Sequence, residues 1–115
     1  MLKLSGEALM GKKEFGIDIP TIDAVTSQIA DVHSNGIKVS VVVGGGNIFR
    51  GVSGATFGMD PSSADYTGMM ATVINSLVLQ SSIEKKGIQT RVMSAIKMDT
   101  VCEPYIRSCL LYTSD

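Results

Sequence analysis

The sequence has no tryptophan, few aromatic residues, only two cysteines and nearly balanced charge. The net charge of −1 gives no electrostatic reason to expect nucleic acid or an anionic membrane as a partner. No stretch approaches the roughly 18 apolar residues that a membrane-spanning helix needs, and no basic-then-apolar leader opens the chain. Cys102 and Cys109 have neither metal-ligand spacing nor the pattern of a disulfide framework, so we expect a reducing, cytoplasmic location.

The residues that are present indicate an α/β protein. Hydrophobic residues make up 44% of the 115-residue chain and charged residues 18%, which is typical of a globular domain. Apolar side chains at three- and four-residue spacing predict a helix with Asp18 as its N-cap, and Asn35-Gly36 should end it. Strands are predicted at residues 1–4 and 37–43. This order forms a βαβ unit, whose two strands lie parallel.

A second, longer helix is predicted to begin near residues 62–63 and to end at Lys85–Gly87, where positive charge and a glycine stop it. Its apolar stripe predicts a core or subunit-interface face rather than a cofactor site. A third strand follows at residues 88–93, and residues 98–107 resemble the start of another helix that Pro104 would break. Three strand ends should therefore meet at one edge of the sheet, where ligands bind in open parallel sheets.

The strand at residues 37–43 runs directly into three glycines, Gly44, Gly45 and Gly46. Glycine has no Cβ, so the backbone can adopt positive φ and turn several N–H groups toward a ligand. Arg50 follows closely and offers a permanently charged, forked donor. The pattern predicts a phosphate site. The alternative is an ordinary loop with a surface arginine, because glycine is common in loops.

Three other side chains are candidates for chemistry. Lys3 ends an apolar strand and could neutralise charge on a moving phosphoryl group, or it could be an edge-strand lysine in solvent. Asp65 is predicted in the first turn of the long helix, where the helix dipole favours a carboxylate. Alternatively, it accepts hydrogen bonds from a ribose. His33 lies near a helix C-terminus and is interpreted as structural. No Ser-His-Asp set, Cys-His set or metal-ligand cluster can be assembled.

Four segments form a colinear pattern: KLSGEAL at 3–9, GGGNIFRG at 44–51, GMMATVIN at 68–75 and RVMSAI at 91–96. Together they resemble the bacterial uridylate (UMP) kinases of the amino acid kinase superfamily. Related aspartate, glutamate and acetylglutamate kinases share a glycine-rich strand end, but not the first two segments together. The resemblance implies a three-layer α/β sandwich with a mainly parallel sheet, the amino acid kinase fold. Residues 1–108 would be the N-terminal part of that domain.

The resemblance also implies a reaction, the transfer of the γ-phosphoryl group of ATP, with Mg²⁺, to UMP to give UDP in pyrimidine nucleotide biosynthesis. On the family pattern, residues from two strand ends line the ATP site: Lys3, Leu4, Ser5, Gly6, Gly46 and Arg50. Lys3 and Arg50 would be catalytic, and no residue is assigned as a metal ligand. Gly45 and Asp65 would bind UMP, which for Asp65 replaces the structural interpretation.

Regulation and assembly are implied in the same way. A charged loop corresponds to the segment that the family associates with activation by GTP: Gly11, Lys12, Lys13, Glu14, Phe15 and Gly16. On spacing alone, its two lysines are a solvated loop. Members of the family form hexamers built from dimers, with the long helix near the dimer contact, and this would explain the apolar stripe.

The chains of the resembling family are about twice as long as this one. The adenine-binding lobe, a UMP-contacting segment and a later aspartate that orients the lysine lie downstream of residue 107, where the resemblance stops. We therefore expect the isolated polypeptide to be inactive. Residues 109–115 are similar to an in-frame translation of a transposase adapter used in sequencing libraries, and we interpret them as a non-native tail to be excluded from fold reasoning.

Two other functions stay open. The glycine-rich strand end would also suit a non-catalytic module that binds a nucleotide or phosphate. A Rossmann-type dinucleotide-binding domain fits less well, because the three adjacent glycines do not have the Gly-x-Gly-x-x-Gly spacing.

Overall fold

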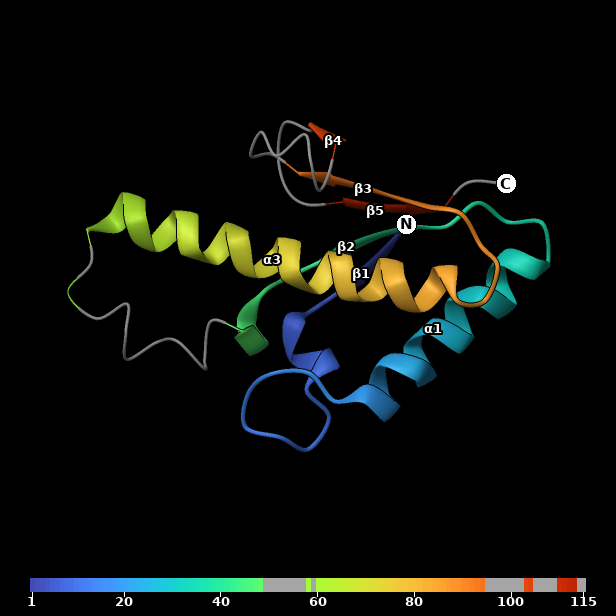
Figure 1. The fold of residues 1–115 in the computed structure, drawn as a ribbon, viewed down its shortest axis with the longest axis horizontal. Helices are drawn as coiled ribbons and strands as arrows, with labels where there is room; N and C mark the ends of the chain where they lie inside the picture. The colour runs from blue at the N-terminus through green and yellow to red at the C-terminus, as the bar shows by residue number, and fades with distance from the viewer. Residues whose placement is uncertain (49–57, 59, 95–102, 105–109, 114–115) are drawn as a thin grey trace.

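The computed structural model describes residues 1–48, 58, 60–94, 103–104 and 110–113. Figure 1 shows the long helix α3 running along the sheet, with α1 beside its C-terminal half. In chain order the elements are β1 (Leu2–Leu4), the 3-10 helix η1 (Gly6–Leu9), α1 (Ile19–Ser34), β2 (Ser40–Val43), α3 (Pro61–Glu84), β3 (Thr90–Ser94), β4 (Glu103–Pro104) and β5 (Leu110–Thr113). Residues 46–48 are also helical.

The strands form one sheet in the order β1-β2-β5-β3-β4. β1 pairs with β2 in parallel, with Lys3 opposite Val42, and β3 pairs with β4 in parallel. β5 is antiparallel to both of its neighbours, β2 and β3. Four strands therefore share one direction, and the predicted α/β fold with a mainly parallel sheet is confirmed.

The position of β5 was not predicted, because residues 109–115 were interpreted as a non-native tail. An unpaired strand edge accepts any extended segment that satisfies its backbone groups, and the edges of β2 and β3 are filled in this way by residues 110–113. A place in the sheet does not decide where the segment comes from. The interpretation of the tail stays a prediction.

Helix α1 begins and ends where the sequence indicates. The Asp18 carboxylate accepts hydrogen bonds from the Thr21 N–H at 3.2 Å and the Thr21 hydroxyl at 2.6 Å, which makes it the N-cap. The helix ends at Ser34, and Gly36 follows with a φ of 80°. The strand predicted at residues 37–43 is shorter and begins at Ser40.

Helix α3 begins slightly earlier than predicted, at Pro61. Its N-cap is Asp60, whose carboxylate accepts a hydrogen bond from the Ser63 N–H at 2.7 Å. Asp65 consequently lies in the second turn, so the interpretation of Asp65 as a helix-start residue is wrong. The predicted end is confirmed, since the helix stops at Glu84.

The helix suggested for residues 98–107 is contradicted where the structure describes this segment, because Glu103–Pro104 forms strand β4. This strand lies at an edge of the sheet, where a proline without an N–H group is tolerated. Residues 98–102 and 105–107 lie outside the described part of the chain.

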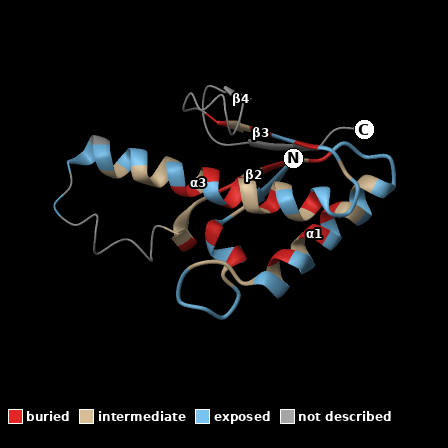
Figure 2. Ribbon diagram, viewed as in Figure 1, coloured by how far each residue is buried: buried red, intermediate tan, exposed pale blue. Residues whose placement is uncertain are grey.

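One hydrophobic core joins the sheet to the helices (Figure 2). Its buried members are Leu9, Ile22, Ile29, Val39, Val41, Val43, Val73, Leu79, Ile83 and Val92. Burial alternates along β2, so Val41 and Val43 face the helices and Val42 faces the other side. In the described residues, α1 and α3 thus form one helical layer on one face of the sheet. No helix among these residues is long and apolar enough to cross a membrane.

Candidate phosphate site at the ends of β1 and β2

The loops that follow β1 and β2 touch each other, as the parallel pairing predicts. The Gly44 N–H donates a hydrogen bond to the Leu4 carbonyl oxygen at 2.9 Å. A Cβ atom on Gly6 would lie 2.5 Å from Oδ1 of Asn47 and 2.6 Å from the nitrogen of Gly46. Real Cβ contacts are longer, so Gly6 must be a glycine for the two loops to meet.

The three glycines after β2 are needed for a different reason from the one predicted. None of Gly44, Gly45 and Gly46 is among the positive-φ residues, so the expectation of a left-handed backbone is wrong. Close approach decides instead at Gly45, where a Cβ atom would lie 2.7 Å from Cβ of Ala71 and 3.0 Å from the nitrogen of Thr72. The glycine-rich loop is therefore pressed against α3.

The third of these glycines, Gly46, is the first residue of a helical turn at residues 46–48. The loop thus leads from the carboxyl end of a strand into the first turn of a helix. The Ile48 N–H already donates to the Gly45 carbonyl oxygen at 3.1 Å, but N–H groups at the start of a helical turn generally suit an anion. The local backbone is compatible with the predicted phosphate site. Arg50, the predicted charged partner, lies outside the described residues.

Two buried asparagines fix the glycine-rich loop, and our residue assignments missed both. Nδ2 of Asn75 donates to the Gly44 carbonyl oxygen at 2.8 Å and to Oδ1 of Asn47 at 2.7 Å. Nδ2 of Asn47 donates to Oδ1 of Asn75 at 3.2 Å and to the Gly16 carbonyl oxygen at 2.9 Å. Both residues are fully buried. The available signal was the polar Asn75 inside an apolar helical stripe, because a buried amide needs partners.

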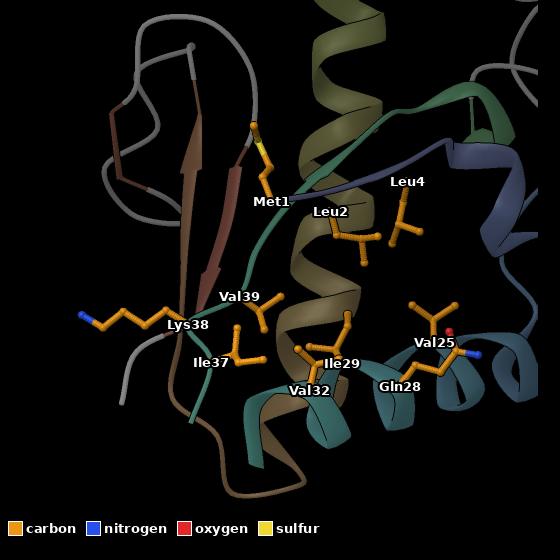
Figure 3. Close-up of a pocket in the computed structure, with 10 residues that line it drawn as sticks. All are labelled: Met1, Leu2, Leu4, Val25, Gln28, Ile29, Val32, Ile37, Lys38 and Val39. Carbon is orange, nitrogen blue, oxygen red and sulfur yellow. The ribbon is translucent and has the colours of Figure 1, made fainter. Parts of the chain in front are cut away.

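Lys3 is exposed on β1 and points away from α1. Its neighbours Leu2 and Leu4 both turn toward α1, as Figure 3 shows, and side chains alternate along a strand. Ser5 is also exposed, and its carbonyl oxygen accepts a hydrogen bond from the Ala8 N–H at 3.1 Å as η1 begins. The structure therefore places these ATP-site candidates in and directly after the edge strand that pairs with β2.

The groove of Figure 3 is separate from this site. It has a volume of about 370 Å³ and lies between β1, α1 and residues 37–39. Its lining is mostly aliphatic: Met1, Leu2, Leu4, Val25, Gln28, Ile29, Val32, Ile37, Lys38 and Val39. A phosphate needs several converging N–H donors, and this lining does not supply them.

Asp65, the predicted ligand of UMP, is exposed on α3. It precedes Ala71, which contacts the glycine-rich loop, by six residues, or about 9 Å along the helix axis. The structure thus brings together Gly6, Gly45 and Gly46, and it places Asp65 farther along the same helix.

Residues 10–17, called loop 10–17 below, lie beside the site. Gly11 and Gly16 have φ angles of 58° and 86°, which glycine adopts without strain. Nζ of Lys13 donates a hydrogen bond to the Ile17 carbonyl oxygen at 3.1 Å, which restricts the movement of this side chain. A pocket of about 400 Å³ is lined by Gly11, Lys12, Lys13, Asp18 and Thr21. The hydrogen bond from the Thr21 hydroxyl is the main reason that the pKa of Asp18 lies below its usual value.

The fold and the strand-end loops define an α/β protein with a glycine-lined site at the edge of a mainly parallel sheet. Residues 1–113 match the family model of the amino acid kinase family, and the chain belongs to this family. The match includes residues 109–113 of the predicted tail.

Two solved structures give the comparison more detail. The chain is similar to the UMP kinase from Bacillus anthracis, with a TM-score of 0.80 and 39% identity over 91% of this chain and 43% of that one. It is also similar to the UMP kinase from Ureaplasma parvum, with a TM-score of 0.77 and 36% identity over 90% of this chain and 44% of that one. The chain thus spans less than half the length of either structure.

Proposed function

We propose that the protein is a nucleoside monophosphate kinase that transfers the γ-phosphoryl group of ATP to UMP. The observation that carries the proposal is the direct contact between the two strand-end loops, Gly6 against Gly44–Asn47. The proposal is supported by the 39% identity to a UMP kinase, although only 43% of that chain is spanned.

In the proposed reaction, an oxygen of the UMP phosphate forms a bond to the γ-phosphorus of ATP while the bond to the β,γ-bridging oxygen breaks. The products are UDP and ADP. Such a transfer needs positioning and positive charge opposite the moving group more than covalent participation of the protein. Lys3 and Arg50 would supply the charge, and the backbone of Gly6 and Gly46 would hold phosphate oxygens.

The remaining assignments are part of the same proposal. Leu4 and Ser5 would complete the ATP site, Gly45 would stand between the two nucleotides, and Asp65 would bind the ribose of UMP. Mg²⁺ would neutralise phosphate charge. We assign the ion to the phosphates of ATP and name no protein ligand.

We also propose that the protein self-associates through α3, as part of a hexamer. Tyr66, Met70 and Ile74 recur every four residues on this helix, and 58%, 42% and 42% of their surfaces are exposed. A row of large apolar side chains in water favours burial against another subunit. Gly11–Gly16, within loop 10–17 and with Lys12 exposed, is the proposed site of activation by GTP. The cytoplasmic location remains a prediction.

The test is UDP formation by the protein expressed from its complete gene, measured by a coupled assay with ATP and UMP. Lys3→Ala should lower kcat/KM by about 100-fold or more, because it removes a charge that stabilises the transition state. Lys86→Ala is the matched control, since Lys86 is exposed just after α3, away from the site. Wild-type protein that leaves UMP unchanged would overturn the proposal.

The same assay separates the alternatives. Nucleotide binding without turnover by the complete gene product would favour the non-catalytic module. The 115-residue chain alone should form no UDP, since it spans less than half of the similar kinases. Turnover by this chain would contradict that expectation.

A further inference from the structure

We propose that Asn47 and Asn75 form a positioning unit that couples loop 10–17 to the glycine-rich loop. The inference rests on the proposed function, because it assumes that Gly45 and Gly46 of the glycine-rich loop contact the nucleotides. Neither asparagine needs to touch the substrate.

The pair is a complete hydrogen-bonding unit. Each primary amide has two N–H donors and one carbonyl acceptor. All four donors are used, two between the asparagines, one to the carbonyl oxygen of Gly16 and one to that of Gly44. Both side-chain oxygens accept from the opposite asparagine. A buried network that is fully satisfied in this way strongly favours one arrangement of its members.

Loop 10–17 is attached to this unit at two points. The Gly16 N–H donates to the backbone oxygen of Asn47 at 2.9 Å, and the Gly16 carbonyl oxygen accepts from Nδ2 of Asn47 at 2.9 Å. Lys12, Glu14 and Phe15, by contrast, are exposed. A change in this loop that moves Gly16 must therefore break both hydrogen bonds or move Asn47.

Asn47 cannot move independently of the candidate phosphate site. Its Oδ1 is packed against Gly6, because a Cβ atom added to Gly6 would lie only 2.5 Å from it. Its amide is joined to Asn75, which holds the Gly44 carbonyl oxygen at 2.8 Å. A displacement of Gly16 consequently reaches the glycine-rich loop through two side chains. Because coupling between two sites is reciprocal, nucleotide bound at the glycine-rich loop should also restrain loop 10–17.

The experiment compares two single variants of the protein expressed from its complete gene. Asn75→Ala removes the link to Gly44 and to α3 but leaves both hydrogen bonds between Asn47 and Gly16 in place. Ser76→Ala is the matched control, because Ser76 is the next residue, is fully buried, and its hydroxyl has no hydrogen-bond partner among the described residues. Far-UV circular dichroism confirms that each variant is folded.

Two quantities are measured, the Kd of ATP and of UMP by calorimetry, and the deuterium uptake of a peptide covering loop 10–17 with and without nucleotide. In wild type and Ser76→Ala, nucleotide should slow the uptake. In Asn75→Ala this protection should be lost, and at least one Kd should rise by about 10-fold. A purely structural role would lower the thermal midpoint without removing the protection of the loop.

Three outcomes would overturn the inference. Nucleotide-dependent protection that persists in Asn75→Ala overturns the coupling while leaving the proposed function intact. Wild-type protein that binds neither nucleotide overturns both. If Asn75→Ala does not fold, the wild-type measurement is decisive by itself: bound nucleotide that leaves the uptake of loop 10–17 unchanged also overturns the coupling.

Discussion

Gly6→Ala tests the contact on which the candidate site depends. The new Cβ atom would meet Oδ1 of Asn47 at 2.5 Å, the nitrogen of Gly46 at 2.6 Å and the oxygen of Gly44 at 3.0 Å. Two of these three atoms are backbone, so a side-chain rotation cannot relieve the clash. Overpacking of this kind costs about 1–3 kcal/mol. If Asn47 is displaced from its pair, each buried amide group left without a partner adds about 1–3 kcal/mol.

Gly46→Ala is the matched control, because among the described residues its Cβ atom would meet the Glu7 side chain alone, at 3.5 Å. This is an ordinary contact, so we expect a change of less than about 0.5 kcal/mol. The assay is urea denaturation followed by circular dichroism, with the free energies of unfolding of both variants compared with wild type. If Gly6→Ala is as stable as Gly46→Ala, the two loops do not meet as described, and the reasoning is refuted.

Three further predictions concern the core, the surface and pH. Leu79→Ala should lower the free energy of unfolding by about 2–5 kcal/mol, because the Leu79 side chain is fully buried. Ile74→Ala should lower it by less than about 0.5 kcal/mol, because Ile74 is exposed. Similar losses for the two variants in urea denaturation would contradict the packing of α3. Ile74→Lys should weaken self-association in sedimentation velocity, while Ile19→Lys, an exposed apolar residue on α1, should not; equal effects would count against the α3 interface. The pKa of Asp18 lies below 3.8, chiefly because of the Thr21 hydroxyl, so its contribution to stability is present above pH 3.8 and is lost as the pH falls through the folded-state pKa. Thr21→Val should reduce this acid dependence of the urea midpoint, and an unchanged dependence would show that another group causes it.

Local sequence features predicted the elements whose signals are themselves local. Asp18 and Asn35-Gly36 mark the two ends of α1 because capping involves only neighbouring residues. The parallel pairing of β1 and β2 was also predictable, since a helical crossover of this length joins parallel strands. The glycine-rich loop was predictable because its signal, three consecutive glycines, is also local.

Tertiary packing decided what these signals left open. Gly45 is required because Ala71 of α3 lies close to it, and not because its φ is positive. The sequence around the loop does not indicate that α3 packs there. The start of α3 at Pro61, rather than at residue 62 or 63 as predicted, fell within the error of boundary prediction.

The Asn47–Asn75 pair is the clearest case of a feature that only the folded chain reveals. The two residues are 28 positions apart, and nothing in the local sequence of either one identifies the other as its hydrogen-bond partner. Burial turns each amide into a group that must find hydrogen bonds, and the fold places them within reach of each other and of Gly16 and Gly44. The sequence thus contained the strands, the helices and the glycine-rich loop, whereas the network that holds this loop in place exists only after distant segments have packed together.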